Sequence, residues 1–336
     1  MIKLGIVGGG VNSAVGAAHV AAMRMTGKFE LVAGMFSRTP EINIDSAEKY
    51  GCEMTAIPEV LLDLFNIDRV VIVTPTINHF DHVAMCTGAK LPVLCEKALG
   101  TNATETANIV VRVNKLNTPL SIVFNYAFYP AVQKLRELIL DGEIGTITHI
   151  HAEMPQSGYL VAKPQDWRLS DMGIYLDLGT HLHHLIWFLS GASPVAVQAV
   201  ERRLSDIGVV DYVSSLVRYP DFDAHLWFSK CSAGHTNGLR IRVYGTNGSA
   251  EWYQREPDVL RLASAEMTNA PILMEVQNPR FKLGHPTGFV EALANVYDAW
   301  ADNPSHPDLS PSVAHDGLVL MEAMRRAAME EKEVIL

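Results

Sequence analysis

The chain has 336 residues, and its 37 acidic side chains outnumber its 27 basic ones, which leaves a net charge of −10 at neutral pH. Apolar residues make up 48% and charged residues 19%, the balance of a folded globular protein, and the length predicts two domains. The acidic balance argues against nucleic acid or an anionic membrane as a partner, since both attract basic surfaces.

The cysteines and the hydropathy narrow the class of protein further. Cys52, Cys86, Cys95 and Cys231 form no Cys-x-x-Cys pair, so the sequence indicates neither a disulfide framework nor a zinc knuckle. No segment approaches the roughly 20 uncharged apolar residues of a membrane span. The N-terminus has no apolar stretch before its first glycines, so we expect no secretory signal and a soluble, cytoplasmic protein.

The first third of the chain alternates predicted strands and helices. Short apolar runs predict strands at 2–7, 29–36, 69–73, 92–95 and 120–124. Helical spacing and start signals predict helices at 14–25, 58–65 and 102–117, with Pro58 in a first turn and Asn102 and Glu105 as a capping box. This alternation is typical of right-handed βαβ units, so we expect a doubly wound parallel sheet over residues 1–123.

After about residue 125 the pattern changes. Strand-like runs lie at 147–153, 195–202, 209–219, 224–230, 239–244 and 249–254, and helices are predicted at 130–140, 176–190, 287–302 and 312–330. Residues 240–244 alternate polar and apolar side chains, as in an antiparallel sheet with one face in water. The sequence therefore predicts an α/β protein with a second domain over 124–336, which includes the three later helices.

A glycine-rich turn follows the first predicted strand. Gly8, Gly9 and Gly10 end that strand, and Gly16 lies in the next helix. In a βαβ unit such glycines allow a tight turn and a close approach of the backbone to a pyrophosphate, which the helix N-terminus then binds. The spacing is longer than Gly-x-Gly-x-x-Gly, and tight packing alone is the alternative. Its place in the first βα turn favours a dinucleotide.

The end of the second strand bears on which dinucleotide binds. An acidic residue usually binds the ribose 2′-hydroxyl of NAD here, but this strand continues into Ser37, Arg38 and Thr39. A hydroxyl beside a guanidinium can instead receive the 2′-phosphate of NADP. A solvated turn is the alternative, so we expect NAD(P), with NADP slightly favoured.

Three further residues are candidates for chemistry. Lys97 follows the strand at 92–95, at the sheet edge where open α/β sheets bind ligands, and it could bind a substrate oxygen and transfer its proton. A surface lysine paired with an acid is the alternative. Asp177 and His181 are four apart, which places them on one face of the predicted helix, where a carboxylate can orient an acid–base imidazole or the pair can satisfy itself in the core.

The histidine clusters also raise the question of a metal. His181, His183 and His184 lie close in sequence, and His149 and His151 alternate on a predicted strand. Zinc requires three or four converging ligands, His183 points away from His181 on a helix, and no His-Glu-x-x-His pattern occurs. We expect no metal site.

These motifs together resemble the glucose–fructose oxidoreductase / inositol dehydrogenase / MocA family over nearly the whole chain. The resemblance lies in the Gly5-Ile-Val-Gly-Gly-Gly10 loop, the turn from Val73 to His79, Cys95-Glu96-Lys97, and the Asp177-x-x-x-His181 helix. It implies an N-terminal Rossmann domain and a C-terminal α/β domain with a large open sheet that serves as a homo-oligomer interface, in a dimer or tetramer.

The resemblance also implies roles for individual residues. Lys97, Asp177 and His181 would be catalytic and would contact the substrate. Cofactor contacts would come from Gly8, Gly9, Gly10, Asn12, Ser13, Ser37, Arg38, Thr74, Pro75, Asn78, His79, Glu96 and Lys97. Further substrate contacts would come from Asn125, Tyr126, Trp167, Arg168 and His285. The chain departs from the family at Ala98, where proline is usual, and at His184, where aspartate is frequent.

We therefore expect an NAD(P)-dependent oxidoreductase that transfers a hydride between the nicotinamide and a secondary hydroxyl or keto carbon of a sugar, sugar derivative or cyclic polyol. Whether Lys97 or His181 accepts the hydroxyl proton stays open. One alternative is a glycoside hydrolase that works by transient oxidation with NAD followed by elimination. Another is a dinucleotide-binding sensor without catalysis.

Overall fold

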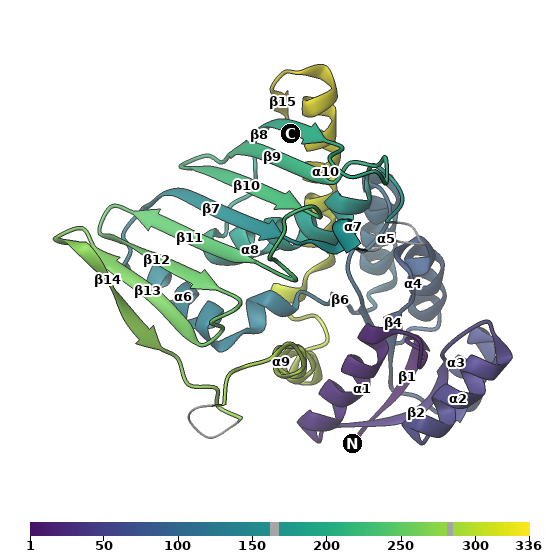
Figure 1. Ribbon diagram of the computed structural model, residues 1–336. Helices are drawn as coiled ribbons and strands as arrows, with labels where there is room; N and C mark the ends of the chain where they lie inside the picture. The colour runs from purple at the N-terminus through teal and green to yellow at the C-terminus, as the bar shows by residue number, and fades with distance from the viewer. Residues whose placement is uncertain (162–167, 281–284) are drawn as a thin grey trace. The chain divides into compact units, whose positions relative to one another are not determined.

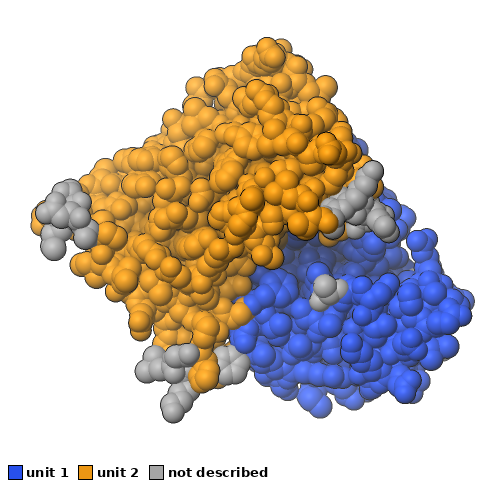
Figure 2. Space-filling view, viewed as in Figure 1, with its two compact units in different colours: residues 1–125, 289–315 blue, residues 126–288, 316–336 orange. Residues whose placement is uncertain are grey.

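The computed structural model describes residues 1–161, 168–280 and 285–336, so Trp167, expected to face substrate, lies outside the described residues. The chain forms two compact units, coloured separately in Figure 2. The first comprises Met1–Asn125 and Phe289–His315, and the second Tyr126–Gly288 and Asp316–Leu336. None of the described helices is long and apolar enough to cross a membrane.

The first unit contains a sheet of six parallel strands in the order β3-β2-β1-β4-β5-β6. Figure 1 labels β1, β2, β4 and β6 of this sheet. Its strands are β1 (Ile2–Gly8), β2 (Phe29–Met35), β3 (Glu53–Met54), β4 (Arg69–Val73), β5 (Val93–Cys95) and β6 (Leu120–Ile122). The strand order reverses between β1 and β4, the kind of switch point at which doubly wound sheets bind ligands. The predicted fold class of this half is confirmed.

Six α-helices lie entirely within this unit. They are α1 (Ala14–Thr26), α2 (Pro40–Tyr50), α3 (Pro58–Leu64), α4 (His79–Gly88), α5 (Ala103–Leu116) and α9 (Phe289–Asp302). The side chain of Asn102 caps α5 by accepting a hydrogen bond from the Glu105 N–H at 2.9 Å. The predicted capping box is only half formed, because the Glu105 carboxylate accepts its hydrogen bonds from Thr101.

Helix α9 corresponds to the segment at 287–302 that the sequence analysis assigned to the second domain. In the structure it packs on α1 in the first unit. Its fully buried Tyr297 and Trp300 rings lie 5.5 and 5.8 Å from the ring of Phe29. Large aromatic rings gain most from burial, so the aromatic face of α9 explains why it returns to the first unit.

The second unit contains a nine-stranded sheet in the order β14-β13-β12-β11-β7-β10-β9-β8-β15. Its strands are β7 (Ile147–Pro155), β8 (Ala196–Arg202), β9 (Tyr212–Arg218), β10 (Asp223–Ser229), β11 (Arg240–Gly245), β12 (Gly248–Tyr253), β13 (Val259–Ser264), β14 (Met267–Glu275) and β15 (Val334–Ile335). The pair β7–β10 is parallel and all other neighbours are antiparallel. The mostly antiparallel open sheet expected here is confirmed.

Helices cover one face of this sheet. The helices on this face are α6 (Pro130–Leu140), α8 (Thr180–Ser190) and the C-terminal part of α10 (Pro311–Glu330), whereas the short α7 (Gly158–Val161) follows the end of β7. Of these, α6 packs on β12 and β13, and α8 on β7 (Figure 1). Strand β11 buries Ile241 and Val243 and leaves Arg240 and Arg242 partly exposed, so the predicted alternation places one face in water.

Candidate functional site

The glycine turn after β1 has the geometry that a dinucleotide loop needs. Gly8 and Gly9 have φ angles of 88° and 72°, the left-handed region that glycine adopts without strain. A Cβ atom at Gly16 would lie 2.0 Å from the carbonyl oxygen of Gly9. Gly16 therefore serves as the glycine that lets the helix pack closely on the turn, although its spacing is longer than usual.

The N-terminus of α1 follows this turn. Ser13 caps it, because its Oγ accepts a hydrogen bond from the Gly16 N–H at 3.1 Å. The first turn of α1 carries no acidic residue, so the partial positive charge of the helix end is not neutralised there. Asn12 is exposed beside it. The open backbone and the helix end fit the pyrophosphate of a dinucleotide.

The end of β2 is as polar as expected and lacks a carboxylate in Ser37, Arg38 and Thr39. The Ser37 hydroxyl accepts a hydrogen bond from the Thr39 N–H at 3.1 Å, and Arg38 is exposed. The turn thus presents a cation to solvent at the place where the ribose of a dinucleotide is usually recognised.

The turn after β4 contains four residues that the resemblance assigns to the cofactor. Pro75 is exposed, Thr74 and Asn78 are partly buried, and His79 is fully buried. The two ring nitrogens of His79 lie 2.7 Å from the Ala98 carbonyl oxygen and 2.8 Å from that of Thr74. Burial lowers the pKa of His79, outweighing the two carbonyl contacts. Its buried ring joins the turns after β4 and β5, which is a positioning role.

Glu96 and Lys97 follow β5. The Glu96 carboxylate lies 2.8 Å from Nε2 of His19 and accepts the Lys97 N–H at 3.1 Å, and Nδ1 of His19 lies 2.8 Å from the Tyr297 hydroxyl. Burial opposes ionisation of Glu96, but the His19 hydrogen bond and the charges of His19 and Lys97 outweigh it, so the pKa of Glu96 is lowered. The Lys97–Ala98 peptide bond is cis.

In the second unit, Asp177 lies in a π-helical turn (Tyr175–Gly179) that leads directly into α8. The sequence analysis expected a regular α-helix here, and this part of the prediction is wrong. A π turn contains more residues than an α turn, and such turns are frequent at functional sites. His181 lies in the first turn of α8 and is buried, and the edge of its ring packs on Tyr126, with ring centroids 4.7 Å apart.

Asp177 has a partner that the sequence analysis did not identify. The Lys230 ammonium donates hydrogen bonds to Oδ2 of Asp177 at 2.5 Å and to Oε1 of Gln156 at 2.7 Å. The Lys230 side chain is only 8% exposed. Because a buried lysine is rare unless it is paired, the pair with Asp177 accounts for its charge.

The same hydrogen-bonded chain continues to the ring beside His181. Nε2 of Gln156 donates to Oδ1 of Asn237 at 3.1 Å, and Nδ2 of Asn237 donates to the Tyr126 hydroxyl at 2.7 Å. We call Tyr126, Gln156, Asp177, His181, Lys230 and Asn237 the polar cluster. No motif marks Lys230 or Asn237. Lys230 is the last residue of the strand predicted at 224–230 and Asn237 lies two residues before the one predicted at 239–244, which is the one available signal.

The remaining predicted substrate residues are spread differently. Nε of Arg168 lies 3.6 Å from Oδ2 of Asp177, so this arginine borders the polar cluster. Asn125, the last residue of the first unit's N-terminal segment, is buried, and its Nδ2 has no hydrogen-bond partner among the described residues. His285 is exposed, and no contact within the described ranges joins it to the polar cluster.

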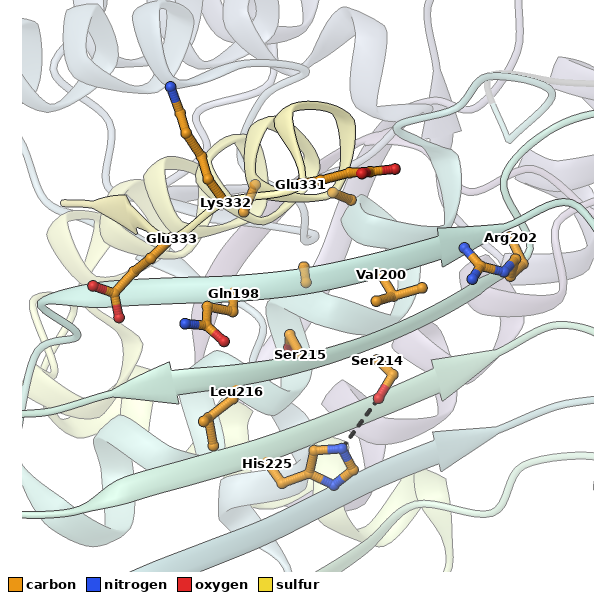
Figure 3. Close-up of a pocket in the computed structure, with 13 residues that line it drawn as sticks. Gln198, Val200, Arg202, Ser214, Ser215, Leu216, His225, Glu331, Lys332 and Glu333 are labelled. Carbon is orange, nitrogen blue, oxygen red and sulfur yellow. Dashed lines mark hydrogen bonds between the residues drawn. The ribbon is translucent and has the colours of Figure 1, made fainter.

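A concavity of the second unit lies elsewhere, over β8, β9 and β10 of the nine-stranded sheet. It measures about 600 Å³, and Figure 3 shows its side chains rising from β8, β9 and β10, beside the end of α10. The Ser214 hydroxyl lies 3.1 Å from Nε2 of His225. His151 packs on His225 with ring centroids 5.5 Å apart, yet residues 1–161, 168–280 and 285–336 contain no group of three or more metal-binding side chains.

Comparison with known proteins places these features in a family. Residues 2–124 match the model of an oxidoreductase family with an NAD-binding Rossmann fold, and residues 132–251 match the GFO/IDH/MocA C-terminal domain. Inositol 2-dehydrogenase of Rhizobium meliloti is 25% identical over 99% of this chain and 98% of its own.

Solved structures agree with this match. An oxidoreductase from Sinorhizobium meliloti shares 27% identity with a TM-score of 0.86, and the match covers 99% of both chains. An inositol dehydrogenase homologue from Azotobacter vinelandii, complexed with NADH and myo-inositol, has the same fold at 23% identity, with a TM-score of 0.88 over 100% of this chain and 97% of its own. The chain therefore belongs to the Gfo/Idh/MocA family and is an NAD-dependent dehydrogenase with a Rossmann cofactor domain.

Proposed function

We propose that this enzyme interconverts a secondary hydroxyl and the corresponding ketone of a sugar, sugar derivative or cyclic polyol. The observation that carries this proposal is the polar cluster, in which Asp177 and His181 are surrounded by amide, ammonium and phenol groups. Such groups match the several hydroxyls of a polyol, because each hydroxyl both donates and accepts hydrogen bonds. The similarity to an inositol 2-dehydrogenase over nearly the full length supports the same substrate class.

The proposed roles follow from the chemistry of each group. Bound NAD(P) would supply the hydride acceptor, held by the turn of Gly8 to Gly10 and the N-terminus of α1. Lys97 would bind the reacting oxygen and, with His181, is one of two candidates for taking its proton. Asp177 would orient the substrate hydroxyls through its carboxylate, and Arg168 at the border of the cluster would contact the substrate too.

A titration and a substrate panel test the proposal. Purified, cofactor-stripped protein is titrated with NADH and NADPH by nicotinamide fluorescence, and a panel of sugars and cyclic polyols is then assayed for NAD(P) reduction. We expect binding of a nicotinamide cofactor and turnover of at least one polyol. Glycoside cleavage without net cofactor reduction would instead support the hydrolase alternative. Binding without any turnover would support the sensor.

We further propose that the cofactor site accepts NADP(H) with a slight preference over NAD(H). The exposed Arg38 and the absence of a carboxylate in residues 37–39 support this proposal, since a guanidinium can pair with the 2′-phosphate. Thr74, Pro75 and Asn78 would line the cofactor, Asn12 and Ser13 would add phosphate contacts, and Glu96 would lie near the ribose. Residues 1–123 would form the cofactor domain and 124–336 the substrate and assembly domain, apart from α9.

Finally, we propose a homo-oligomer, a dimer or tetramer, formed through the open face of the nine-stranded sheet. On this face Val200 and Leu216 are 45% and 48% exposed at the edge of the concavity in Figure 3. Large exposed apolar side chains beside a concavity favour burial against another chain. Light scattering on Leu216→Glu should give a smaller particle than wild type, whereas Leu140→Glu, on the exposed end of α6, should not change it.

A further inference from the structure

We infer that Lys230 is a positioning residue for Asp177, and that Gln156 and Asn237 extend this positioning to the Tyr126 ring on which His181 packs. The catalytic meaning of this inference rests on the proposed function, in which Asp177 and His181 act on the substrate. The positioning itself rests only on contacts within the second unit.

Strand pairing brings Lys230 and Gln156 together. β7 and β10 are parallel neighbours, and their last residues, Pro155 and Ser229, are register partners. Gln156 and Lys230 are the next residue on each strand, and the Gln156 N–H donates to the Ser229 carbonyl at 2.7 Å. Because the ends of parallel strands meet at one edge, this register holds the amide and the ammonium side by side.

The backbone of Lys230 is itself held in place. Its N–H donates to the carbonyl oxygen of Asp211 at 2.8 Å, and Asp211 is fully buried, with its carboxylate accepting hydrogen bonds from the Leu204 and Ser205 N–H groups. A side chain whose backbone and terminal ammonium are both hydrogen-bonded has little conformational freedom. The ammonium is thereby kept at one place beside Oδ2 of Asp177.

Stability alone does not explain a buried ion pair at this position. Replacing a buried ion pair by apolar side chains of similar volume is often neutral or stabilising, whereas removing one partner is strongly destabilising. The chain nevertheless keeps a lysine that is 8% exposed against an aspartate that is 15% exposed. The lysine holds the Asp177 carboxylate in one place, which an apolar pair at these positions would not do.

When Lys230 is removed, the positive charge that remains beside Asp177 depends on the other groups that face its carboxylate. Nε of Arg168 lies 3.6 Å from the same Oδ2, but its side chain is 37% exposed, so solvent screens its charge more. The ammonium of Lys230 also lies 5.9 Å from the centre of the Tyr159 ring, whose face favours a cation. Lys230 is therefore better shielded from solvent than Arg168.

The first test compares Lys230→Met with Lys230→Arg and with Lys134→Met, a partly exposed lysine on α6 that pairs with Glu137. Loss of the ammonium should lower kcat/KM by about 10²-fold through misplacement of Asp177. It should also move the acid limb of the pH profile to higher pH, because a neighbouring cation favours the carboxylate. Lys230→Arg should recover part of the wild-type kcat/KM and of the wild-type pH profile. NADH affinity should stay unchanged in all three variants.

An unchanged pH profile in Lys230→Met would overturn the inference, and so would a loss of kcat that arginine does not partly restore. The second test does not depend on turnover. Thermal unfolding is measured for Lys230→Met, Asp177→Asn and the double variant. Lys230→Met alone should lower the melting temperature by roughly 5–10 °C, since it leaves a buried carboxylate without its ammonium.

The melting temperature of the double variant should then fall by less than the sum of the decreases in the two single variants. Additive losses would overturn the inference even if a substrate is found. If the wild type turns over no member of the panel, the proposed function fails, and the unfolding cycle still decides whether Lys230 and Asp177 are coupled.

Discussion

The two sheets of this protein hold their polar groups in different ways. In the first unit, buried polar side chains bond mainly to the backbone or to one another in a short relay, as His79 does with two carbonyls and His19 with Glu96 and Tyr297. In the second unit, side chains bond to side chains over a longer chain from Asp177 to Tyr126. The first arrangement fixes loops, whereas the second joins side chains from helices and from the loops that follow β7 and β10.

This difference shows which part of a site can be read from sequence. A loop fixed by its own backbone has a local signature, such as the glycines after β1. A cluster assembled from residues 126, 156, 177, 230 and 237 has none, because its members meet only after the second sheet has formed. The Lys230 and Asp177 variants described above test the second unit, and the following variants test the first.

The largest effect is expected from Lys97→Met. If Lys97 binds the reacting oxygen and transfers its proton, its loss should lower kcat/KM by about 10²–10⁴-fold. Binding of NADH, followed by fluorescence, should remain within a few-fold of wild type. Lys115→Met, on the exposed surface of α5, is the matched control. Turnover of Lys97→Met within a few-fold of wild type would remove the catalytic assignment.

Gly16→Ala tests the glycine loop. A Cβ atom 2.0 Å from the Gly9 oxygen must displace helix or turn, which should cost about 1–3 kcal/mol of stability. The same displacement should weaken NADH binding at least tenfold in the fluorescence titration. Gly158→Ala is the control, because a Cβ there meets nothing within 4 Å. Equal NADH affinity in both variants would show that the turn does not hold the cofactor.

Glu96→Gln tests the relay in the first unit through the pH dependence of stability. The pKa of Glu96 is lowered in the folded state, so its carboxylate adds stability above the ordinary carboxyl pKa, and that stability is lost as the pH falls through the folded value. Urea unfolding should show Glu96→Gln less stable than wild type by about 1–2 kcal/mol at pH 6. That difference should shrink by pH 3. Glu137→Gln, at an exposed position on α6, should show no such trend.

Arg38→Ala should give the smallest effect. An exposed guanidinium that pairs with a 2′-phosphate contributes about 1 kcal/mol, so NADPH affinity should fall roughly 3–10-fold. NADH affinity should not change, since NADH lacks that phosphate. A parallel fall in the affinity for both cofactors would instead indicate that Arg38 supports the loop and does not select the cofactor.

Much of the fold followed from sequence patterns, and its misses have physical causes. The apolar strands of the parallel sheet and the alternating β11 were predicted to within a few residues. Helix α2 was missed because its sequence, PEINIDSAEKY, is mostly polar. Strand β3 was missed because its two residues are too few to show a hydrophobic periodicity. The π turn at Asp177 was missed because residues four apart on a sequence give no sign of an altered helical pitch.

The candidate site was predictable only in part. The glycine loop, Lys97, Asp177 and His181 were found because motif and position coincide. Lys230 was not found, because a single lysine after a strand looks like any surface lysine until its strand is paired with β7. The assigned roles of all these residues stay predictions until the variants above are measured.

The return of α9 to the first unit bears on how the protein is synthesised. N-terminal domains generally fold first as a chain leaves the ribosome. Here Tyr297 and Trp300, which cover Phe29, are translated after nearly the whole second unit. Part of the aromatic core of the nascent first unit therefore stays uncovered through most of translation. A chain that ends before Phe289 lacks α9 and cannot complete this core.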